Sequence, residues 1–561
     1  MALFFVWIRA QMEQPFLEVD ESRSLGMSFE LAPPVALKPL SIHQAAAALK
    51  YDSPEQALKE AEVFAAKIAL GVLTSEWNRT CEKNYNPVLC SSLREYFGDH
   101  GRRTASASGI SGKMKRITSK RPIQVKFIGD LQGEDLGLLM NRMPKLNFEQ
   151  INDLSAVALK SPSCPRSLSI ALARSLEDHL EKPGAWELME SLDDTGLVCL
   201  EETDPSSEYV FLRVALLRIW REKLDDAVAL LKRAYSATER RESHRVLYWL
   251  SRVQKMRGQI EDAQRFRVAL FAEHPMSWQA IKSYVDQGYD PLDAFRSVPS
   301  YPDKYYSGNM TVDRRVHWLR LLGKLENVDF SFTKFGTYTV SRLDKNIDAG
   351  VFQHLARTFD HEGQHRLQIL VMSRLLQLRP DQISIESLRL LFPKPYMEEI
   401  GLHSPNTDTA ILLGLARQES GFDPRARSGA NAMGLLQVLP GTAREIRKNS
   451  NLMSAKDNVA IGALYFEKMV RIFNGSVERA LAAYNAGQGR VRTWDRRYVF
   501  IKEDQLYMDL IPYRETREYV SSILRNAYWY HRLFPELTDP LRKGKGSGPK
   551  TSDMLREQLG I

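Results

Sequence analysis

The sequence predicts a mainly α-helical protein whose middle part is a helical superhelix of the α-solenoid kind. From about residue 147 to residue 380, apolar residues recur three and four positions apart, as in DLSAVALK and YVFLRVALLRIW. This spacing places apolar side chains on one face of a helix. A weak internal repeat supports the prediction, because WREKLDDAVALLKRA and KMRGQIEDAQRFRVA place Ala227 and Ala263 36 residues apart, close to the length of helix-pair repeats.

The repeat has a simple physical basis. A small residue after a turn lets two helices approach, and each helix pair must bury its apolar face on the next pair. A third, looser copy is DHEGQHRLQILVMSRLLQLRP, with Gly363 at the turn. Because only two copies match well, an irregular helical bundle remains the alternative. The segment Val328 to Ser341 (VDFSFTKFGTYTVS) is the exception, since its alternating pattern favours a β-strand.

The length and composition predict several domains. A chain of 561 residues is too long for one compact core, and about three or four domains are expected. Pro393 and Pro395 in LFPKPY break any helix and mark the last boundary. We expect an N-terminal segment (1–40), a helical region (41–98), a basic flexible linker (99–122), the superhelix (147–390), a C-terminal domain (391–535) and a basic tail (541–561).

The N-terminus and the cysteines leave alternatives open. Ala2 to Ile8 is apolar but short, and no basic residue precedes it, so it is either an atypical or truncated signal or a hydrophobic start that packs. No run of 18 apolar residues occurs, so no membrane span is predicted. The four cysteines form two local disulfides or remain buried thiols; their spacing is compatible with the pairs Cys81–Cys90 and Cys164–Cys199. They form no CxxC or Cys/His cluster, so no zinc site is predicted.

The charge indicates little about partners. With 77 basic and 69 acidic residues, the net charge is +8, a mild excess that favours a solvated basic surface. It would also help an approach to an anionic polymer. The basic stretch Arg102 to Arg121 lacks the interleaved aromatic residues that stack on single-stranded nucleic acid, so no nucleic-acid partner is predicted.

One carboxylate stands in an unusual place. TAILLGLARQES reads as an amphipathic helix from Thr409 to Ser420, ended by Gly421 and Pro424. Glu419 therefore lies at the last turn of an apolar helix, where desolvation and the negative end of the helix dipole both raise the pKa of a carboxyl group. A raised pKa suits a general acid near neutral pH. Taken alone, an exposed glutamate at a helix end explains the pattern better.

The segments that follow Glu419 favour the general acid over the exposed glutamate. Together they resemble, in order, the motifs of the soluble lytic transglycosylase family: ES, a Pro five residues and a Ser nine residues after the Glu, then GLxQ, AYNAG and ETR. Each motif is weak by itself, but four in order form a specific match. The segments are ESGFDPRARSGANAMGLLQVLPGTA (419–443), NVAIGALYF (458–466), ALAAYNAGQGRV (480–491) and IPYRETREYV (511–520).

The resemblance is specific for 391–534 and loose for about 150–390, where YWLSRVQKMRG is similar to the helical superhelix of these enzymes. It implies a superhelix followed by a lysozyme-like α-helical catalytic domain with a saccharide groove. It also implies that Glu419 is the catalytic acid and base, without a metal or cofactor. Asn431 stands where the family usually has Gly, and Asn tolerates the left-handed backbone that such a loop needs. The substrate-binding residues implied are Ser420, Ser428, Gln437, Tyr484, Asn485 and Glu515.

The resemblance further implies cleavage of the β-1,4 bond between N-acetylmuramic acid and N-acetylglucosamine in peptidoglycan. Glu419 would protonate the leaving oxygen and then remove the proton of the C6 hydroxyl, which closes a 1,6-anhydro ring. A hydrolytic muramidase on the same fold and a non-catalytic peptidoglycan-binding scaffold are the alternatives. The expected location is the periplasm or cell envelope, and the expected partners are peptidoglycan strands, with cell-wall or envelope proteins as further candidates.

Overall fold

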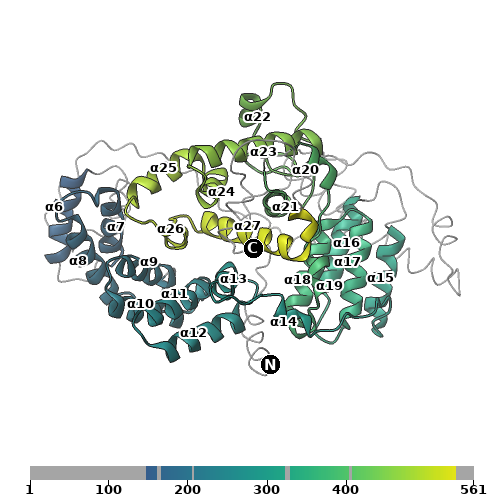
Figure 1. The fold of residues 1–561 in the computed structure, drawn as a ribbon, viewed down its shortest axis with the longest axis horizontal. Helices are drawn as coiled ribbons and strands as arrows, with labels where there is room; N and C mark the ends of the chain where they lie inside the picture. The colour runs from purple at the N-terminus through teal and green to yellow at the C-terminus, as the bar shows by residue number, and fades with distance from the viewer. Residues whose placement is uncertain (1–146, 161–165, 205–206, 323–328, 404–406, 539–561) are drawn as a thin grey trace, which may run out of the picture. The chain divides into compact units, whose positions relative to one another are not determined.

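The computed structural model describes residues 147–160, 166–204, 207–322, 329–403 and 407–538 (Figure 1). These residues form helices joined by turns, and their only β-type pairings are the isolated bridges Arg427–Met433 and Met433–Val438. The mainly α fold class is therefore confirmed for this part of the chain. The predicted N-terminal segment, the helical region 41–98, the linker 99–122 and the tail 541–561 lie outside the described residues.

The described residues fall into two compact units. The first contains the described parts of Val125–Asp313 and Val340–Ile561, and the second contains those of Arg314–Thr339. The second unit comprises most of α15 (Met310–Leu322) and α16 (Asp329–Ser341). The predicted boundary near residue 391 lies inside the first unit and stays a prediction.

In the first unit, the helices before residue 391 follow one another as neighbouring pairs (Figure 1). The pairs α7–α8, α9–α10, α11–α12 and α17–α18 have the most extensive contacts of this part. The elements are α6 (Phe148–Lys160), α7 (Arg166–Leu176), η4 (Glu177–His179), α8 (Ala185–Val198), α9 (Ser207–Trp220), α10 (Leu224–Ser236), α11 (Ser243–Met256), α12 (Ile260–Glu273), α13 (Trp278–Val285), α14 (Asp293–Arg296), α17 (Ala349–His361), α18 (His365–Leu378), η5 (Pro380–Gln382) and α19 (Ile385–Leu391).

The internal repeat in the sequence corresponds to the turn between the two helices of a pair. Ala227 and Ala263 are both the fourth residue of their helices, α10 and α12, and both are buried. In three of these pairs, a residue with a left-handed backbone lies in the turn between the two helices. The backbone N–H of the residue that follows it donates to the carbonyl five residues earlier. This hydrogen bond ends the first helix of the pair. The left-handed residues are Glu222, Gly258 and Gly363, and the bonds are Lys223 N to Arg218 O (2.9 Å), Gln259 N to Gln254 O (2.8 Å) and Gln364 N to Phe359 O (2.7 Å).

The β-strand predicted for Val328 to Ser341 is wrong. Asp329–Ser341 forms helix α16. The hydroxyls of Thr337 and Thr339 donate to the carbonyls of Thr333 (2.9 Å) and Phe335 (2.8 Å), one turn earlier. Threonine can satisfy its hydroxyl within a helix in this way, and a short alternation of Phe and Thr does not outweigh that.

Among the C-terminal helices, α21 and α27 pack most extensively against each other, and α24 packs against α27 and α23 (Figure 1). Gly414 of α21 lets α21 and α27 approach closely, since a Cβ atom there would lie 3.2 Å from the carbonyl oxygen of Ile523. The elements are α20 (Met397–His403), α21 (Thr409–Glu419), α22 (Pro440–Ile446), α23 (Ala455–Ile472), α24 (Val477–Ala486), α25 (Gln488–Arg497), α26 (Asp504–Leu510), α27 (Arg514–Leu533) and η6 (Pro535–Thr538).

Two further expectations can be compared with the structure. Cys199, which follows α8, is disulfide-bonded, so it is not a buried free thiol. The other three cysteines lie outside the described residues, and their pairing stays a prediction. None of the helices in the described ranges combines the length and apolar composition needed to cross a bilayer.

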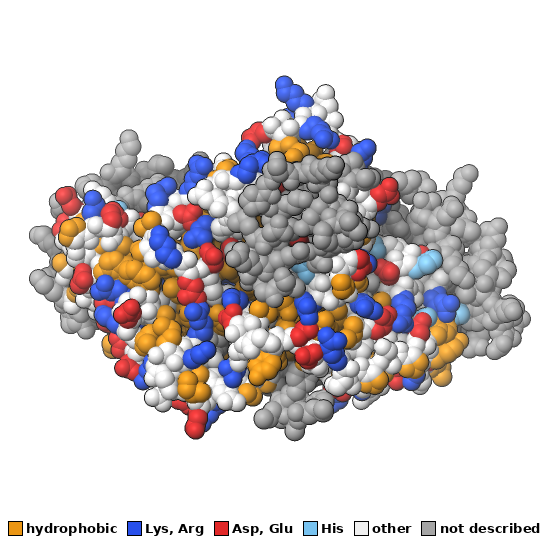
Figure 2. Space-filling view, viewed as in Figure 1, with side chains coloured by type: hydrophobic (Ala, Val, Ile, Leu, Met, Phe, Trp, Pro, Cys, Tyr) orange, Lys and Arg blue, Asp and Glu red, His pale blue; other side chains and the backbone are white. Residues whose placement is uncertain are grey.

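The surface agrees with a mild charge excess. On the face in Figure 2, basic and acidic side chains are interspersed over the described residues and do not gather into one basic region. This distribution matches the solvated surface expected from the small net charge.

A buried charged network joins the repeat helices to the C-terminal helices. Arg245 of α11 is fully buried and donates to Asp509 of α26 (2.8 Å), to Glu518 of α27 (2.6 Å) and to Glu242 (2.6 Å). The indole of Trp249 donates to the other oxygen of Asp509 (2.8 Å). A buried guanidinium is tolerated here because each bond reaches a carboxylate from a different element.

We predict that Arg245→Ala strongly destabilises the protein. The substitution leaves buried carboxylates without their cation, and breaking a buried ion pair in this way costs about 3–5 kcal/mol. Thermal and urea unfolding would measure the loss. Arg265→Ala, at an exposed position of α12, is the control and should change little. Equal unfolding curves for the two variants would contradict the structural role of the network.

Candidate active site

Glu419 lies in the last turn of α21, as the sequence predicts, and is its last residue, one position before the predicted end at Ser420. Asp408 caps the start of this helix by accepting from the backbone N–H groups of Ala410 (2.9 Å) and Ile411 (3.1 Å). The side chain of Glu419 is half-buried. Desolvation and, to a smaller extent, the neighbouring Glu515 raise the pKa of its carboxyl group, and the net pKa is about 7. The expected raised pKa is therefore confirmed, and burial is its largest cause.

Tyr519 of α27 is the direct partner of this carboxyl group. Its hydroxyl donates a hydrogen bond to Oε1 of Glu419. This bond lowers the pKa of Glu419 and so works against the effect of burial. Burial and the nearby Glu419 raise the pKa of Tyr519 well above its ordinary value, so the phenol stays a donor at neutral pH. The sequence contained Tyr519 in the ETR segment, but nothing in the pattern indicated its role.

Tyr484 lies in the same environment as Glu419, and the substrate-binding role expected for it stays a prediction. Burial and Glu419 raise its pKa well above the ordinary value. Its hydroxyl donates to the carbonyl oxygen of Leu436 (2.8 Å), and its ring lies 5.2 Å from that of Tyr465, centroid to centroid. Glu419, Tyr484, Tyr519 and the loop at Leu436 therefore form one cluster, built from α21, α24 and α27.

Ser420 connects the end of α21 to that loop. Its hydroxyl is buried and lies within hydrogen-bond distance of the carbonyl oxygens of Ala416 (3.1 Å) and Leu435 (2.9 Å). These contacts hold the backbone beside Glu419 in place. The substrate-binding role expected for Ser420 stays a prediction.

The loop from Ala426 to Val438 is closed by its own polar groups. Ser428 accepts at its hydroxyl from the N–H of Ala432 (3.0 Å), and Asn431 has a left-handed backbone with φ of 64°. Asn431 thus provides the conformation for which glycine would otherwise be needed. Gln437 also has a positive φ, and its amide donates to the carbonyls of Ala426 (3.0 Å) and Gly434 (2.9 Å). The predicted substrate contacts of Ser428 and Gln437 stay predictions.

Asn458 is a residue that the sequence reasoning missed. It is fully buried in α23, and its amide donates to the carbonyls of Met433 (2.7 Å) and Leu452 (2.9 Å) while its oxygen accepts from the N–H of Leu436 (2.7 Å). One side chain thus satisfies two backbone groups of the loop that Tyr484 contacts and joins them to Leu452, which lies ahead of α23. The available signal was a polar residue at the start of the apolar helix NVAIGALYF.

Asn485 and Glu515 also come together. The amide of Asn485 lies 3.5 Å from Oε1 of Glu515, and its oxygen accepts from the hydroxyl of Thr516 (2.6 Å). Glu515 is exposed but close enough to Glu419 to raise its pKa. The structure therefore brings Glu419, Tyr484, Asn485 and Glu515 into one region. This arrangement can donate and accept a proton at a single carboxyl group beside neutral tyrosines.

The C-terminal part of the chain matches a known domain family. Residues 399–506 match the family model described as the transglycosylase SLT domain. The matched segment contains Glu419, Gln437 and Tyr484, and Glu515 and Tyr519 lie just beyond its end. This match confirms, for residues 399–506, the family expected from the sequence motifs.

Curated relatives agree over the same region. The soluble lytic murein transglycosylase of Salmonella typhimurium is 33% identical over 152 residues, which is 25% of this chain and 24% of that protein. The protein of the same name from Escherichia coli strain K12 is 35% identical over 135 residues, covering 22% of this chain and 21% of that protein. The chain thus aligns with about a quarter of the length of the relatives that it matches.

Solved structures extend the likeness to the upstream helices. The 70 kDa soluble lytic transglycosylase from Escherichia coli has a TM-score of 0.51 at 20% identity, covering 74% of this chain and 63% of that chain. The lytic transglycosylase Slt from Pseudomonas aeruginosa, an inactive mutant, has a TM-score of 0.50 at 21% identity, covering 73% and 65%. At this identity the likeness concerns the fold, and it confirms a helical superhelix followed by a lysozyme-like helical domain.

We predict that Gly434→Ala disrupts the loop beside Glu419. Gly434 has φ of 75°, and an added Cβ would lie 2.3 Å from both the Asn458 amide nitrogen and the Leu452 carbonyl oxygen. The substitution would therefore strain the backbone and displace Asn458. The matched control is Gly489→Ala in α25, where an added Cβ meets no atom within 4 Å. Melting temperatures should fall for the first variant and hold for the second; equal values would refute the packing described.

Proposed function

We propose that this chain is a peptidoglycan lytic transglycosylase. It cleaves the β-1,4 bond between N-acetylmuramic acid and N-acetylglucosamine and leaves a 1,6-anhydro end. The observation that carries the proposal is the half-buried carboxyl group of Glu419, whose pKa is raised to about 7, in a domain that matches the transglycosylase SLT model. The names of the matched relatives, which are murein transglycosylases, support the substrate class.

The first step is proton donation. Near pH 7 about half of the Glu419 carboxyl groups carry a proton. Because Tyr519 donates its hydrogen bond to Oε1, Oε2 is the oxygen left to carry the transferable proton. Its transfer to the glycosidic oxygen breaks the bond to C1 of the muramic acid, which passes through an oxocarbenium-like state. The N-acetyl group of the same sugar can trap this state as an oxazolinium, as in substrate-assisted glycosidases.

The second step uses the same group as a base. The anionic Glu419 is disfavoured by burial and by Glu515, and is stabilised by the Tyr519 hydroxyl. It removes the proton from the C6 hydroxyl, whose oxygen attacks C1 and closes the anhydro ring, while the bond between C1 and the N-acetyl oxygen breaks and the acetamido group is restored. The carboxyl group returns to its protonated form, and no water is consumed.

The hydrolytic alternative needs a way to activate water. Asp423, the nearest acid along the chain, accepts from the N–H of Arg425 (2.8 Å) in its own turn, and Glu515 is exposed and hydrogen-bonded to Asn485. Neither arrangement favours a second catalytic carboxylate, which supports the one-carboxylate mechanism. A non-catalytic scaffold is less consistent with a carboxyl group held in a desolvated place.

The substrate class implies a location. Peptidoglycan lies outside the cytoplasm, so we propose that the protein acts in the periplasm or cell envelope. The expected partners are peptidoglycan strands, and cell-wall or envelope proteins are further candidates. The proposal assigns the reaction to the C-terminal domain alone.

We predict that Glu419→Gln abolishes anhydro-product formation. The amide cannot exchange a proton, and loss of general acid–base catalysis lowers a rate by about a hundredfold to ten-thousandfold. Mass spectrometry of digested peptidoglycan would show 1,6-anhydro-muropeptides with the wild type and almost none with the variant. Glu261→Gln, the same change at an exposed position of α12, is the control. Products with reducing ends in the wild type would support the muramidase instead.

We predict a pH profile that follows Glu419. The first step needs the protonated acid, so activity should decline as the pH rises through about 7. Tyr519→Phe removes a hydrogen bond that lowers this pKa, so the decline should move to higher pH, by roughly one unit. Initial rates from pH 5 to pH 9 would measure this.

Tyr465→Phe is the matched control for the pH profile. Tyr465 lies against Tyr484, and its hydroxyl forms no hydrogen bond with Glu419 in the described structure. Its profile should therefore coincide with that of the wild type. An unchanged profile for Tyr519→Phe would show that the hydrogen bond does not act on the catalytic acid.

A further inference from the structure

Helix α27 also borders a cavity that the reaction at Glu419 does not use. The cavity has a volume of about 460 Å³ and is lined by residues of α11 to α13, α18 and α27. This volume is within the range of small-molecule sites, roughly 300–1,000 Å³. Its principal lining residues are His244, His274, Trp278, Leu376, Ser522 and Arg525.

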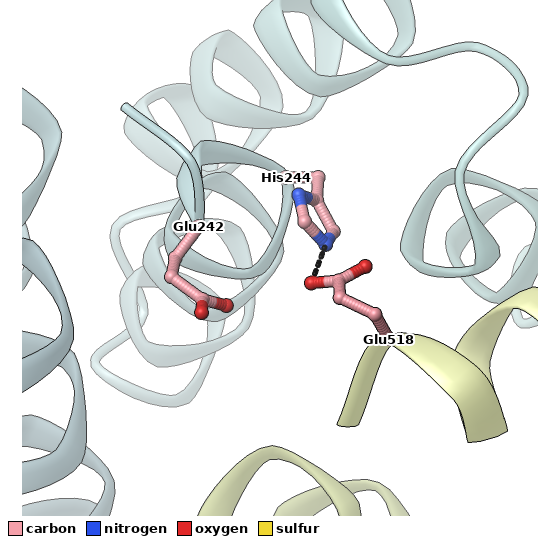
Figure 3. A group of neighbouring side chains, drawn as sticks. All are labelled: Glu242, His244 and Glu518. Carbon is pink, nitrogen blue, oxygen red and sulfur yellow. Dashed lines mark ion pairs between the residues drawn. The ribbon is translucent and has the colours of Figure 1, made fainter. Parts of the chain in front are cut away.

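The cluster beside this cavity is not a metal site. Glu242, His244 and Glu518 bring potential ligand atoms within 4.8 Å of one another (Figure 3). However, the guanidinium of Arg245 donates to Glu242 (2.6 Å), to Glu518 (2.6 Å) and to Nε2 of His244 (2.9 Å). An arginine cation thus already satisfies the three groups that a metal ion would need.

His244 faces the cavity as a neutral donor. Arginine has no acceptor, so Nε2 of His244 must be the accepting nitrogen in its bond with Arg245. Burial and Arg245 lower the pKa of His244 to about 4, and the neutral ring therefore carries its proton on Nδ1. In the described structure no protein group accepts from that nitrogen, which leaves a donor available at the cavity wall.

Arg525 is the basic residue of the cavity lining, which also contains the carboxylates of Glu273 and Glu518. Each of these carboxylates is paired with another arginine, Glu273 with Arg240 and Glu518 with Arg245.

The only hydrogen bonds of Arg525 in the described structure are to the side-chain oxygen of Asn526 (3.3 and 3.2 Å), and no carboxylate of the described residues lies within ion-pair distance of it. Glu518, the acid that acts on it electrostatically, is held by Arg245. Burial, together with Arg417, lowers the pKa of Arg525 to about 10. A guanidinium in this position would gain from an anionic partner.

We infer that this cavity binds the terminal carboxylate of a short peptide. A guanidinium forms paired hydrogen bonds with a planar carboxylate, and His244 and Ser522 add neutral donors. Trp278 and Leu376 provide an apolar wall for small side chains, which favours an organic carboxylate over inorganic phosphate. Peptidoglycan carries short peptides with free carboxylates, so the choice of peptide rests on the proposed function.

The test is direct binding to the full chain carrying Glu419→Gln. Isothermal titration calorimetry would compare acetyl-D-alanyl-D-alanine with its C-terminal amide, which has the same size without the charge. We expect the acid to bind at least about tenfold more tightly than the amide, because a hydrogen bond to a charged group changes Kd by about that factor. Equal binding of the two, or tighter binding of inorganic phosphate, would overturn the proposal.

Variants locate the binding site. Arg525→Gln should weaken binding of the acid about tenfold or more and remove the difference from the amide, whereas Arg525→Lys should retain part of it. Arg532→Gln, on the same helix but paired with Asp290, should bind as the parent does. Ser373→Trp adds bulk to the lining from an exposed position and should also block binding. Binding unaffected by both Arg525→Gln and Ser373→Trp would refute this location.

The outcome can be separated from that of the proposed function. Binding is measured without catalysis, and product formation is measured without the peptide. If anhydro-products form but the peptide does not bind, the transglycosylase proposal stands and the proposed peptide site is refuted. If the peptide binds but no anhydro-products form, the proposed peptide site stands and the transglycosylase reaction is refuted. Melting temperatures complete the test, because Arg525→Gln breaks no ion pair and should leave the protein as stable as its parent.

Discussion

The desolvated carboxyl group at the end of α21 is the constraint on which the proposed chemistry depends. In water, a glutamate would be ionised at neutral pH and could not donate a proton. Burial raises the pKa of Glu419 and the Tyr519 hydroxyl lowers it, and the net pKa is about 7. The two opposing effects keep both protonation states accessible, which a group that acts first as an acid and then as a base requires. The fold must therefore hold a partly buried charge without a salt bridge.

Packing of the surrounding helices and loop holds the Glu419 carboxyl group in this desolvated position. Gly414 lets α21 and α27 approach closely, so that Tyr519 reaches Glu419 from the neighbouring helix. Asn458 and Ser420 fix the loop beside the carboxyl group through bonds to its backbone. Further along α27, Glu518 joins the buried network of Arg245, and Arg525 lines the cavity that we assign to a carboxylate. One helix thus connects the site to the rest of the first unit.

The sequence predicted features that depend on local pattern. The bounds of α21, the position of Glu419, the helix-pair turns and the left-handed backbone at Asn431 all follow from neighbouring residues. It did not indicate Tyr519, Asn458 or Arg245, because their roles depend on partners far along the chain: Tyr519 and Glu419 are 100 residues apart. The strand predicted for Val328 to Ser341 failed for a related reason, since a short alternation cannot show that threonine hydroxyls find acceptors within a helix.

The central claim is that one carboxyl group serves twice and that no water enters the product. Digestion of peptidoglycan in water enriched in oxygen-18, followed by mass spectrometry of the released fragments, tests this most directly. The account predicts muramic acid ends that lack the heavy isotope and carry the mass of an internal anhydro ring. Incorporation of one heavy oxygen atom at each new end would show that water is the nucleophile, and would contradict the account.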